Sequence, residues 1–222
     1  MSVLLNKEIT GLKKKILQMT AMVEESVRKS VNAVRHKDEA LADEVIRTDD
    51  EIDLMENALE EECLKILALH QPVAADLRYV VACLKINNDL ERIGDLAVNI
   101  AQRAKAISSE KDDFIPGSIS EMIEKAISML KKSLDAFIET DAALAREVSS
   151  LDDEIDALNR NMYQEVRNMI MQDPKRTGYL LHVLGVSRQL ERIGDYACNI
   201  SEDVIYMIEG RIVRHDKLSG KG

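Results

Sequence analysis

The sequence predicts an all-α protein built from two pseudo-symmetric antiparallel three-helix bundles, with six long helices in all. Its 222 residues are 45% hydrophobic and 32% charged, with 3% aromatic residues and no Trp. A composition rich in Leu, Ile, Met, Ala, Glu and Lys is typical of helical bundles. The three Pro and nine Gly residues leave few positions at which a helix must end.

An internal repeat divides these helices into two sets. The segment Leu90–Asp95 returns unchanged, 100 positions later, as Leu190–Asp195. Each copy continues with Ala, Asn and Ile at the same spacing: Ala97, Asn99 and Ile100, then Ala197, Asn199 and Ile200. Upstream, the acidic segment 49–53 returns as 152–156. A repeat over this length indicates two copies of one supersecondary unit.

The first half predicts three helices. Apolar residues recur at steps of three and four, the period of an amphipathic helix, at Ile9, Leu12, Ile16, Met19 and Val23. We expect this helix to run to His36. Asp38 can cap a second helix by accepting from free first-turn amides, and this helix ends near Pro72, because the residue before proline disfavours helical conformation. A third helix follows over 73–107.

The second half repeats this order after a polar linker that contains Pro116 and Gly117. Ser118 or Ser120 is the expected cap of the fourth helix, and Thr140 or Asp141 that of the fifth. We expect the fifth helix to end at 173–174 and the sixth to run over 175–210, with Gly210 as its terminating residue. The predicted division is a first repeat over 1–110, a linker over 111–117, a second repeat over 118–212 and a polar tail over 213–222.

Charge and hydropathy exclude several classes of function. The net charge is −10, whereas nucleic-acid binders usually carry the opposite balance. No apolar run approaches the ~20 residues that span a bilayer, and the N-terminal segment lacks the apolar core of a signal peptide. We therefore expect a soluble cytoplasmic protein. No nucleophile with its base, phosphate-binding loop or dinucleotide fingerprint is found, so we expect no enzymatic activity.

The three cysteines form no metal-binding or disulfide pattern. In the alignment of the two halves, each stands opposite a valine: Cys63 opposite Val166, Cys83 opposite Val183 and Cys198 opposite Val98. We expect all three to be small core side chains.

Two carboxylate pairs in each half are candidate ligands. Asp49 and Asp53, like Glu91 and Asp95, are four residues apart and so share one helix face. Asp53 lies 19 residues before Pro72 and Glu91 lies 19 residues after it, so an antiparallel hairpin places them level. In the shorter second hairpin the distances from Pro174 are 18 and 17 residues, which preserves the pairing to about one residue's rise of ~1.5 Å.

Carboxylates brought together repel one another by on the order of 4 kcal/mol per close pair at 4 Å. A bound cation relieves this repulsion. The alternative is that the side chains point into water, with Arg92 pairing with Asp95 as an ordinary surface ion pair. The candidate metal ligands are Asp49, Asp53, Glu91, Asp95 and Asn99, and Asp152, Asp156, Glu191, Asp195 and Asn199. All-oxygen ligation favours Mg, Mn, Ca or ferric iron.

At these residues the chain resembles the PhoU family of phosphate-signalling proteins. The resemblance covers about residues 5 to 212. It is carried by Gln71–Ala74, Asp76–Arg78, Leu84–Ile86 and Asp89–Asp95 in the first half, and by 152–156, 173–174 and 190–199 in the second. Asp89 is Gln189 in the other copy, so the two halves are not fully symmetric.

The resemblance implies two three-helix bundles with iron or zinc on the repeated carboxylate motifs. It further implies an accessory protein that negatively regulates phosphate uptake and starvation signalling. The implied partners are the ATPase of a phosphate ABC transporter and a phosphate-sensing histidine kinase, and a homodimer is the implied assembly. Two alternatives remain open: a protein that handles iron, or a metalloenzyme, on carboxylate ligands, and a plain interaction bundle whose carboxylates are solvated.

Overall fold

The structure, a computed structural model, describes residues 3–110 and 116–213. The elements are α1 (Val3–His36), α2 (Glu39–His70), α3 (Ala74–Ser108), α4 (Gly117–Glu139), α5 (Ala142–Gln172), a 3₁₀ turn η1 (Pro174–Arg176) and α6 (Thr177–Glu209). The described residues contain no strand, so the predicted all-α class with six long helices is confirmed. None of these helices carries an apolar stretch long enough to cross a bilayer.

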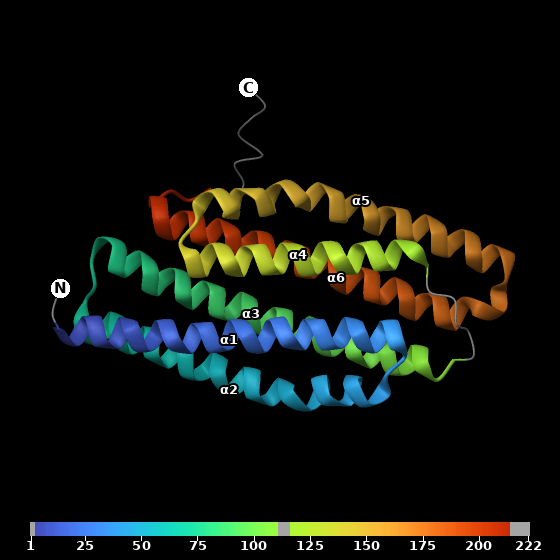
Figure 1. Ribbon diagram of the computed structural model, residues 1–222, viewed down its shortest axis with the longest axis horizontal. Helices are drawn as coiled ribbons and strands as arrows, with labels where there is room; N and C mark the ends of the chain where they lie inside the picture. The colour runs from blue at the N-terminus through green and yellow to red at the C-terminus, as the bar shows by residue number, and fades with distance from the viewer. Residues whose placement is uncertain (1–2, 111–115, 214–222) are drawn as a thin grey trace, which may run out of the picture.

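The helices α3 and α6 form the joint between the two repeats (Figure 1). They run antiparallel: Nζ of Lys85 in α3 lies 2.8 Å from Oδ1 of Asp203 in α6, and Nε of Arg78 donates to the carbonyl of Met207 at 3.1 Å. In Figure 1, α1 and α2 lie along the lower edge and α5 along the upper edge, with α3 and α6 crossing between them. One continuous apolar core therefore serves both repeats.

The apolar stripe predicted for the first helix is buried in this core. Leu12, Ile16, Met19 and Val23 are each at most 1% exposed. Ile119 and Met122 of α4, which stand where Ile16 and Met19 stand in α1, are buried in the same way. Burial of one such side chain stabilises the fold by roughly 1.5–3 kcal/mol.

Several predicted helix ends are confirmed. Asp38 accepts a hydrogen bond from the Leu41 amide at 3.0 Å, and Asp141 accepts from the amides of Ala143 and Leu144. Thr140, the other candidate, instead ends α4 in a left-handed conformation. Gly210 ends α6 with a φ of 70°.

Other predicted ends are wrong. The fourth helix begins at Gly117, and neither Ser118 nor Ser120 caps it. Ser118 lies inside the first turn, where its hydroxyl bonds the Glu165 carboxylate of α5. The sixth helix begins at Thr177 because a 3₁₀ turn, capped by Asp173, comes first. Most of the predicted linker, residues 111–115, lies outside the described residues.

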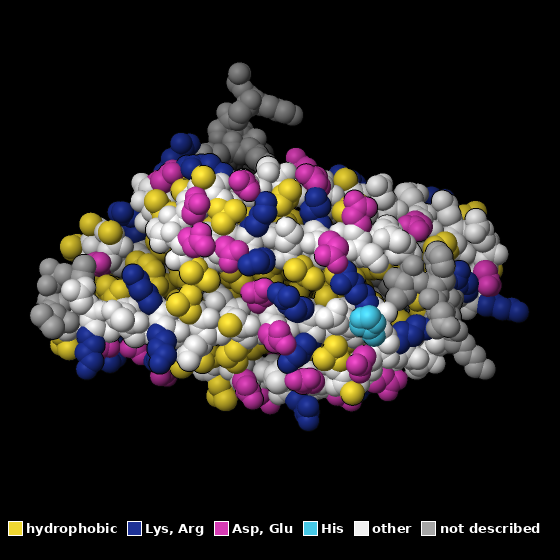
Figure 2. All heavy atoms as spheres, viewed as in Figure 1, with side chains coloured by type: hydrophobic (Ala, Val, Ile, Leu, Met, Phe, Trp, Pro, Cys, Tyr) yellow, Lys and Arg dark blue, Asp and Glu magenta, His cyan; other side chains and the backbone are white. Residues whose placement is uncertain are grey.

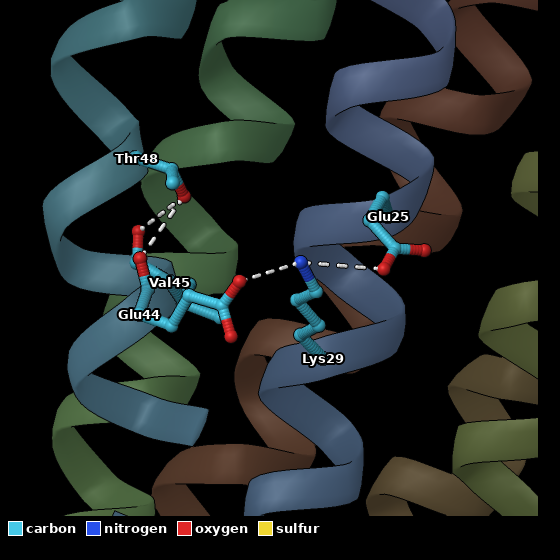
Figure 3. Close-up of polar contacts among 5 residues, drawn as sticks. All are labelled: Glu25, Lys29, Glu44, Val45 and Thr48. Atoms are coloured by element: carbon cyan, nitrogen blue, oxygen red, sulfur yellow. Dashed lines mark hydrogen bonds and ion pairs between the residues drawn. The ribbon is translucent and has the colours of Figure 1, made fainter. Parts of the chain in front are cut away.

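A lysine bridge joins the first two helices of each repeat. Nζ of Lys29 lies 2.9 Å from Glu44 and 3.3 Å from Glu25 (Figure 3), and the hydrogen bond to Glu44 raises the pKa of Lys29. In the second repeat Lys132 and Glu147 stand at the equivalent positions, 3.1 Å apart. These bridges tie α1 to α2 and α4 to α5 along the part of α2 and α5 that carries the acidic segments.

Candidate metal centres

Two buried glycines let the second and third helices of each repeat approach closely. A Cβ placed on Gly94 would lie 3.3 Å from Cγ2 of Ile52 and 3.7 Å from Oδ1 of Asp49. A Cβ on Gly194 would lie 3.2 Å from Cδ1 of Ile155. Since a glycine costs roughly 1 kcal/mol in a helix interior, its repeated use reflects this close approach, which brings the α2 carboxylates to α3 and those of α5 to α6.

The first candidate centre joins α2 to α3. Burial raises the pKa of Asp49 to about 6, and the negative charges of Asp53 and Asp95 add to this rise. The pKa of Glu91 is also raised, first by burial and then by Asp95, and Asp53 contributes. Carboxylates of both helices thus share one electrostatic environment, and the level arrangement predicted from the hairpin is present in the structure.

The second candidate centre joins α5 to α6. Burial raises the pKa of Asp195 to about 6, with further contributions from Glu191, Asp152 and Asp156. Burial raises the pKa of Glu191 too, assisted by Asp156. One carboxylate oxygen from each of Asp152, Asp156 and Asp195 lies within 4.8 Å of the others. Three hard oxygen donors at this spacing suit a single divalent or trivalent cation.

Comparison with known proteins identifies this two-repeat architecture. The family model of the PhoU domain matches the chain twice, over residues 16–104 and 119–204. The chain belongs to the PhoU family. Each match covers the three helices of one repeat, including both acidic segments, so the two candidate centres occupy equivalent places in two PhoU domains.

Individual relatives match over almost the whole chain. A protein of Clostridium acetobutylicum, named a phosphate-specific transport system accessory protein PhoU homolog, is 37% identical over 93% of this chain and 94% of its own length. A homolog of the same name from Aquifex aeolicus is 38% identical, over 97% of this chain and 98% of its own.

Two solved structures share the fold. PhoU from Pseudomonas aeruginosa superposes with a TM-score of 0.90 at 37% identity, over 93% of this chain and 99% of that chain. The phosphate transport system regulatory protein PhoU from Streptococcus pneumoniae gives a TM-score of 0.86 at 28% identity, over 94% of this chain and 99% of that chain.

The two PhoU domains differ at their carboxylates. In the first, Arg92 lies beside the cluster: its Nε is 3.3 Å from Oε2 of Glu91 and its Nη1 is 3.2 Å from Oδ2 of Asp95. The ion pair with Asp95, which the sequence offered as the alternative to a bound cation, is therefore present in this repeat. Within the described residues, the equivalent Arg192 forms no ion pair, and the second cluster is the one whose three aspartates converge.

The asparagines named as candidate ligands lie one turn beyond the clusters. Asn99 is exposed and Asn199 half-buried. Neither forms a hydrogen bond to a carboxylate among the residues that the structure describes. The structure thus gathers the eight acidic candidates into two groups and leaves both amides at their margins.

One cysteine departs from the sequence prediction. Cys63 and Cys83 are fully buried, and burial raises the pKa of each thiol to about 12. Cys198 is only half-buried, and its Sγ lies 3.7 Å from Oδ1 of Asp152. Burial, followed by the charge of Asp152, raises the pKa of this thiol. Cys198 follows Asp195 by three residues and so shares its helix face. This spacing could have predicted that the thiol lies beside the carboxylates, but the alignment with Val98 suggested a core position instead.

Proposed function

We propose that this PhoU-family protein is a cytoplasmic, metal-binding accessory protein and negative regulator of phosphate uptake and phosphate-starvation signalling. In this proposal it acts through contacts with a phosphate transporter, a sensor kinase or both. The observation that carries the proposal is the grouping of carboxylates from two helices at equivalent places in both repeats, with three aspartates converging in the second.

The names of the relatives support the role in phosphate transport. Two relatives that match almost the whole chain are named homologs of a phosphate-specific transport system accessory protein, and one solved relative is named a regulatory protein of the phosphate transport system. The family is an accessory family, which agrees with the expectation of a non-enzymatic protein. The proposed partners are the transporter ATPase and a phosphate-sensing histidine kinase, and the proposed assembly is a homodimer.

A cation bound at either cluster would reduce the repulsion between its carboxylates. Each cluster holds acidic groups whose pKa is raised by burial and by mutual repulsion. A bound iron, zinc, magnesium or manganese ion would neutralise them. Because the ligands come from two helices, it would also fix α2 against α3 and α5 against α6. The proposed ligands are the eight acidic residues, with Asn99 and Asn199 as further donors.

Metal analysis tests the first part of the proposal. The protein, purified with and without chelator, is titrated with Mn²⁺, Zn²⁺ and Fe²⁺ and its bound metal measured by mass spectrometry. We expect stoichiometric binding at both centres, and Asp152→Asn plus Asp195→Asn should remove the share that is bound at the second centre. Asp153→Asn, on the exposed face of α5, is the control. If no metal binds stoichiometrically, or the control loses as much, the carboxylates are not metal ligands.

Genetic complementation tests the second part. Deletion of the gene should raise phosphate-starvation gene expression or change phosphate uptake. The intact chain should restore both, and the Asp152→Asn plus Asp195→Asn variant should restore them incompletely. Unchanged expression and uptake in the deletion strain would contradict the regulatory role.

A further inference from the structure

A cavity of about 420 Å³ opens at one end of the joint between the repeats. Its walls come from α1, the start of α3 and the ends of α4 and α6, so both repeats contribute. The apolar side chains around it include Ile16, Leu17, Phe137, Ile138 and Met207. Leu17 and Ile138 remain 41% and 49% exposed. Figure 2 shows apolar side chains gathered between α1 and α4 on this side of the molecule.

The cavity carries positive charge in an acidic protein. Nζ of Lys13 lies 5.0 Å from the ring centroid of Tyr79, and Arg78 uses its Nε to bond the Met207 carbonyl. Among the described residues, neither cation pairs with a carboxylate. Asp76 is the one acidic side chain among the described lining residues. The whole chain has a net charge of −10, so the excess of positive charge in this cavity differs in sign from the protein as a whole.

The start of α3 adds to this charge. Val73 occupies the N-cap position and offers no side-chain hydrogen bond to the first turn. The helix dipole favours a negative group at this end, and Asp76 of the first turn supplies one. Ala75 and Asp76, which belong to this turn, line the cavity.

The internal repeat shows what lies at the equivalent place at the other end of the joint. Tyr179 is the counterpart of Tyr79, and Nζ of Lys37 lies 5.8 Å from its ring centroid. That lysine donates to the carbonyl of Glu110 at 3.5 Å. Oε1 of Glu110 lies 3.9 Å from where a Cβ on Gly178, the counterpart of Arg78, would be placed. Here the carbonyl of Glu110, at the end of α3, accepts from Lys37, and its carboxylate lies near the start of α6.

We propose that the cavity is the docking site for an extended acidic and apolar segment of a partner protein. The segment lies in the cavity against Tyr79. Its carboxylates pair with Lys13 and Arg78, and its apolar side chains cover Leu17 and Ile138. The cavity supplies the kind of protein contact on which the proposed function depends. It is separate from the metal centres, because Arg78 and Glu91 are 13 residues, about 20 Å, apart along α3.

A peptide taken from the chain itself is a suitable probe. The peptide Ser-Ser-Glu-Lys-Asp-Asp-Phe-Ile-Pro-Gly, the sequence of residues 108–117, contains Glu110 and combines acidic with apolar residues. Labelled with fluorescein, it is titrated with the full chain and followed by fluorescence polarisation. We expect saturable binding that Lys13→Glu weakens by at least about tenfold. Lys14→Glu, on an exposed neighbour outside the cavity, should change the Kd less than about twofold.

A second peptide, in which the three acidic residues are replaced by lysine, should not bind. The proposal is overturned if the acidic peptide shows no saturable binding, if both peptides bind alike, or if the two lysine variants weaken binding equally. Circular dichroism of each variant checks that the helices are intact. A dimer in sedimentation velocity that Lys13→Glu dissociates would also overturn it, because the occupant would then be a second copy.

The same titration separates this inference from the metal-binding proposal. Asp152→Asn plus Asp195→Asn should leave peptide binding unchanged, with or without chelator. If metal binding fails while the peptide binds through Lys13, the docking site stands without the metal centres. If metal binds and the peptide does not, the docking site is wrong and the metal centres stand.

Discussion

Lys85 and Asp203 form an ion pair across the joint between the repeats, with Nζ 2.8 Å from Oδ1. The Asp203 carboxylate is buried, whereas the lysine side chain is 39% exposed and lies 5.3 Å from the ring centroid of Tyr206. The equivalent positions at the other end hold Gly185 and Arg103, and a Cβ on Gly185 would collide with the Arg103 guanidinium. An ion pair therefore joins α3 to α6 at one end of the joint, and close packing of Arg103 against Gly185 joins them at the other.

Removal of this lysine should destabilise the protein. Lys85→Met leaves the buried carboxylate without the ammonium that faces it. Loss of one partner of a buried pair costs about 3–5 kcal/mol, and the partial exposure of Lys85 reduces this to about 2 kcal/mol. Urea denaturation measures the change.

The matched control is Lys105→Met, which removes a surface partner of Asp43 at 2.6 Å. It should lower the urea midpoint much less than Lys85→Met does, because solvent screens this exposed pair. Equal losses in the two variants would show that burial of Asp203 does not make the joint pair stronger than a surface pair.

The helix contact at the second centre should resist a larger side chain. Gly194→Val places methyl groups against Ile155 and Met129, both buried, where even a Cβ lies 3.2–3.4 Å from them. Overpacking of this kind costs about 1–3 kcal/mol. Thermal unfolding of the metal-free protein measures it.

Gly11→Val is the control for that prediction, because the site is open: apart from its chain neighbours and its own helix backbone, no heavy atom of the described residues lies within 4 Å of its Cβ position. Valine there should change stability by less than about 0.5 kcal/mol. A destabilisation at Gly11 as large as that at Gly194 would show that packing against Ile155 and Met129 does not set the cost.

Features decided within a few residues could be predicted from the sequence. Asp38 and Asp141 cap their helices because the amides that they bind are two or three residues away. Ser118 has the same local pattern but bonds Glu165, 47 positions away. A cap that competes with a tertiary partner therefore cannot be assigned from local sequence.

In the candidate centres, too, the helix positions could be predicted from the sequence, whereas the side-chain contacts could not. Equal distances from the bend predict that Asp53 faces Glu91, because helix rise is constant. The ion pair of Arg92 in one repeat and its absence among the described residues for Arg192 in the other could not be predicted, since the motif is identical in both. Side-chain conformation there depends on neighbouring helices, as does the half-buried position of Cys198 beside Asp152.

The stability of the metal-free protein should depend on pH, because the charged carboxylates of the clusters are destabilised by burial and by one another. Asp49 and Asp195 have ordinary pKa values of 3.8, raised to about 6 in the folded protein. Between these values the folded state binds more protons than the unfolded state, so stability falls as pH rises through this window. Urea midpoints measured in chelator between pH 4 and pH 6 should show this fall.

Asp49→Asn plus Asp195→Asn should flatten that part of the profile, because the amides do not titrate. Since every other group still titrates in the variant, the difference between the two profiles isolates Asp49 and Asp195. A wild-type profile that matches the variant, or rises more steeply with pH, would show that these carboxylates are not destabilised when charged.

Arg92 should control which of the two proposed centres binds metal first. It is an internal cation beside Glu91 and Asp95, so a metal ion at the first centre must compete with it. Isothermal titration with Mn²⁺ should therefore resolve two affinities, with the tighter assigned to the second repeat. Arg92→Gln should strengthen the weaker site by roughly tenfold, a change of about 1.4 kcal/mol. Arg192→Gln, the same change in the other copy, should have a smaller effect. The charge of Arg192 opposes the rise in the pKa of Asp195, but Arg192 forms no ion pair with the described residues. If the two arginine variants gain equally, the difference between the clusters lies elsewhere, and the ion pairs of Arg92 exert no control over metal binding.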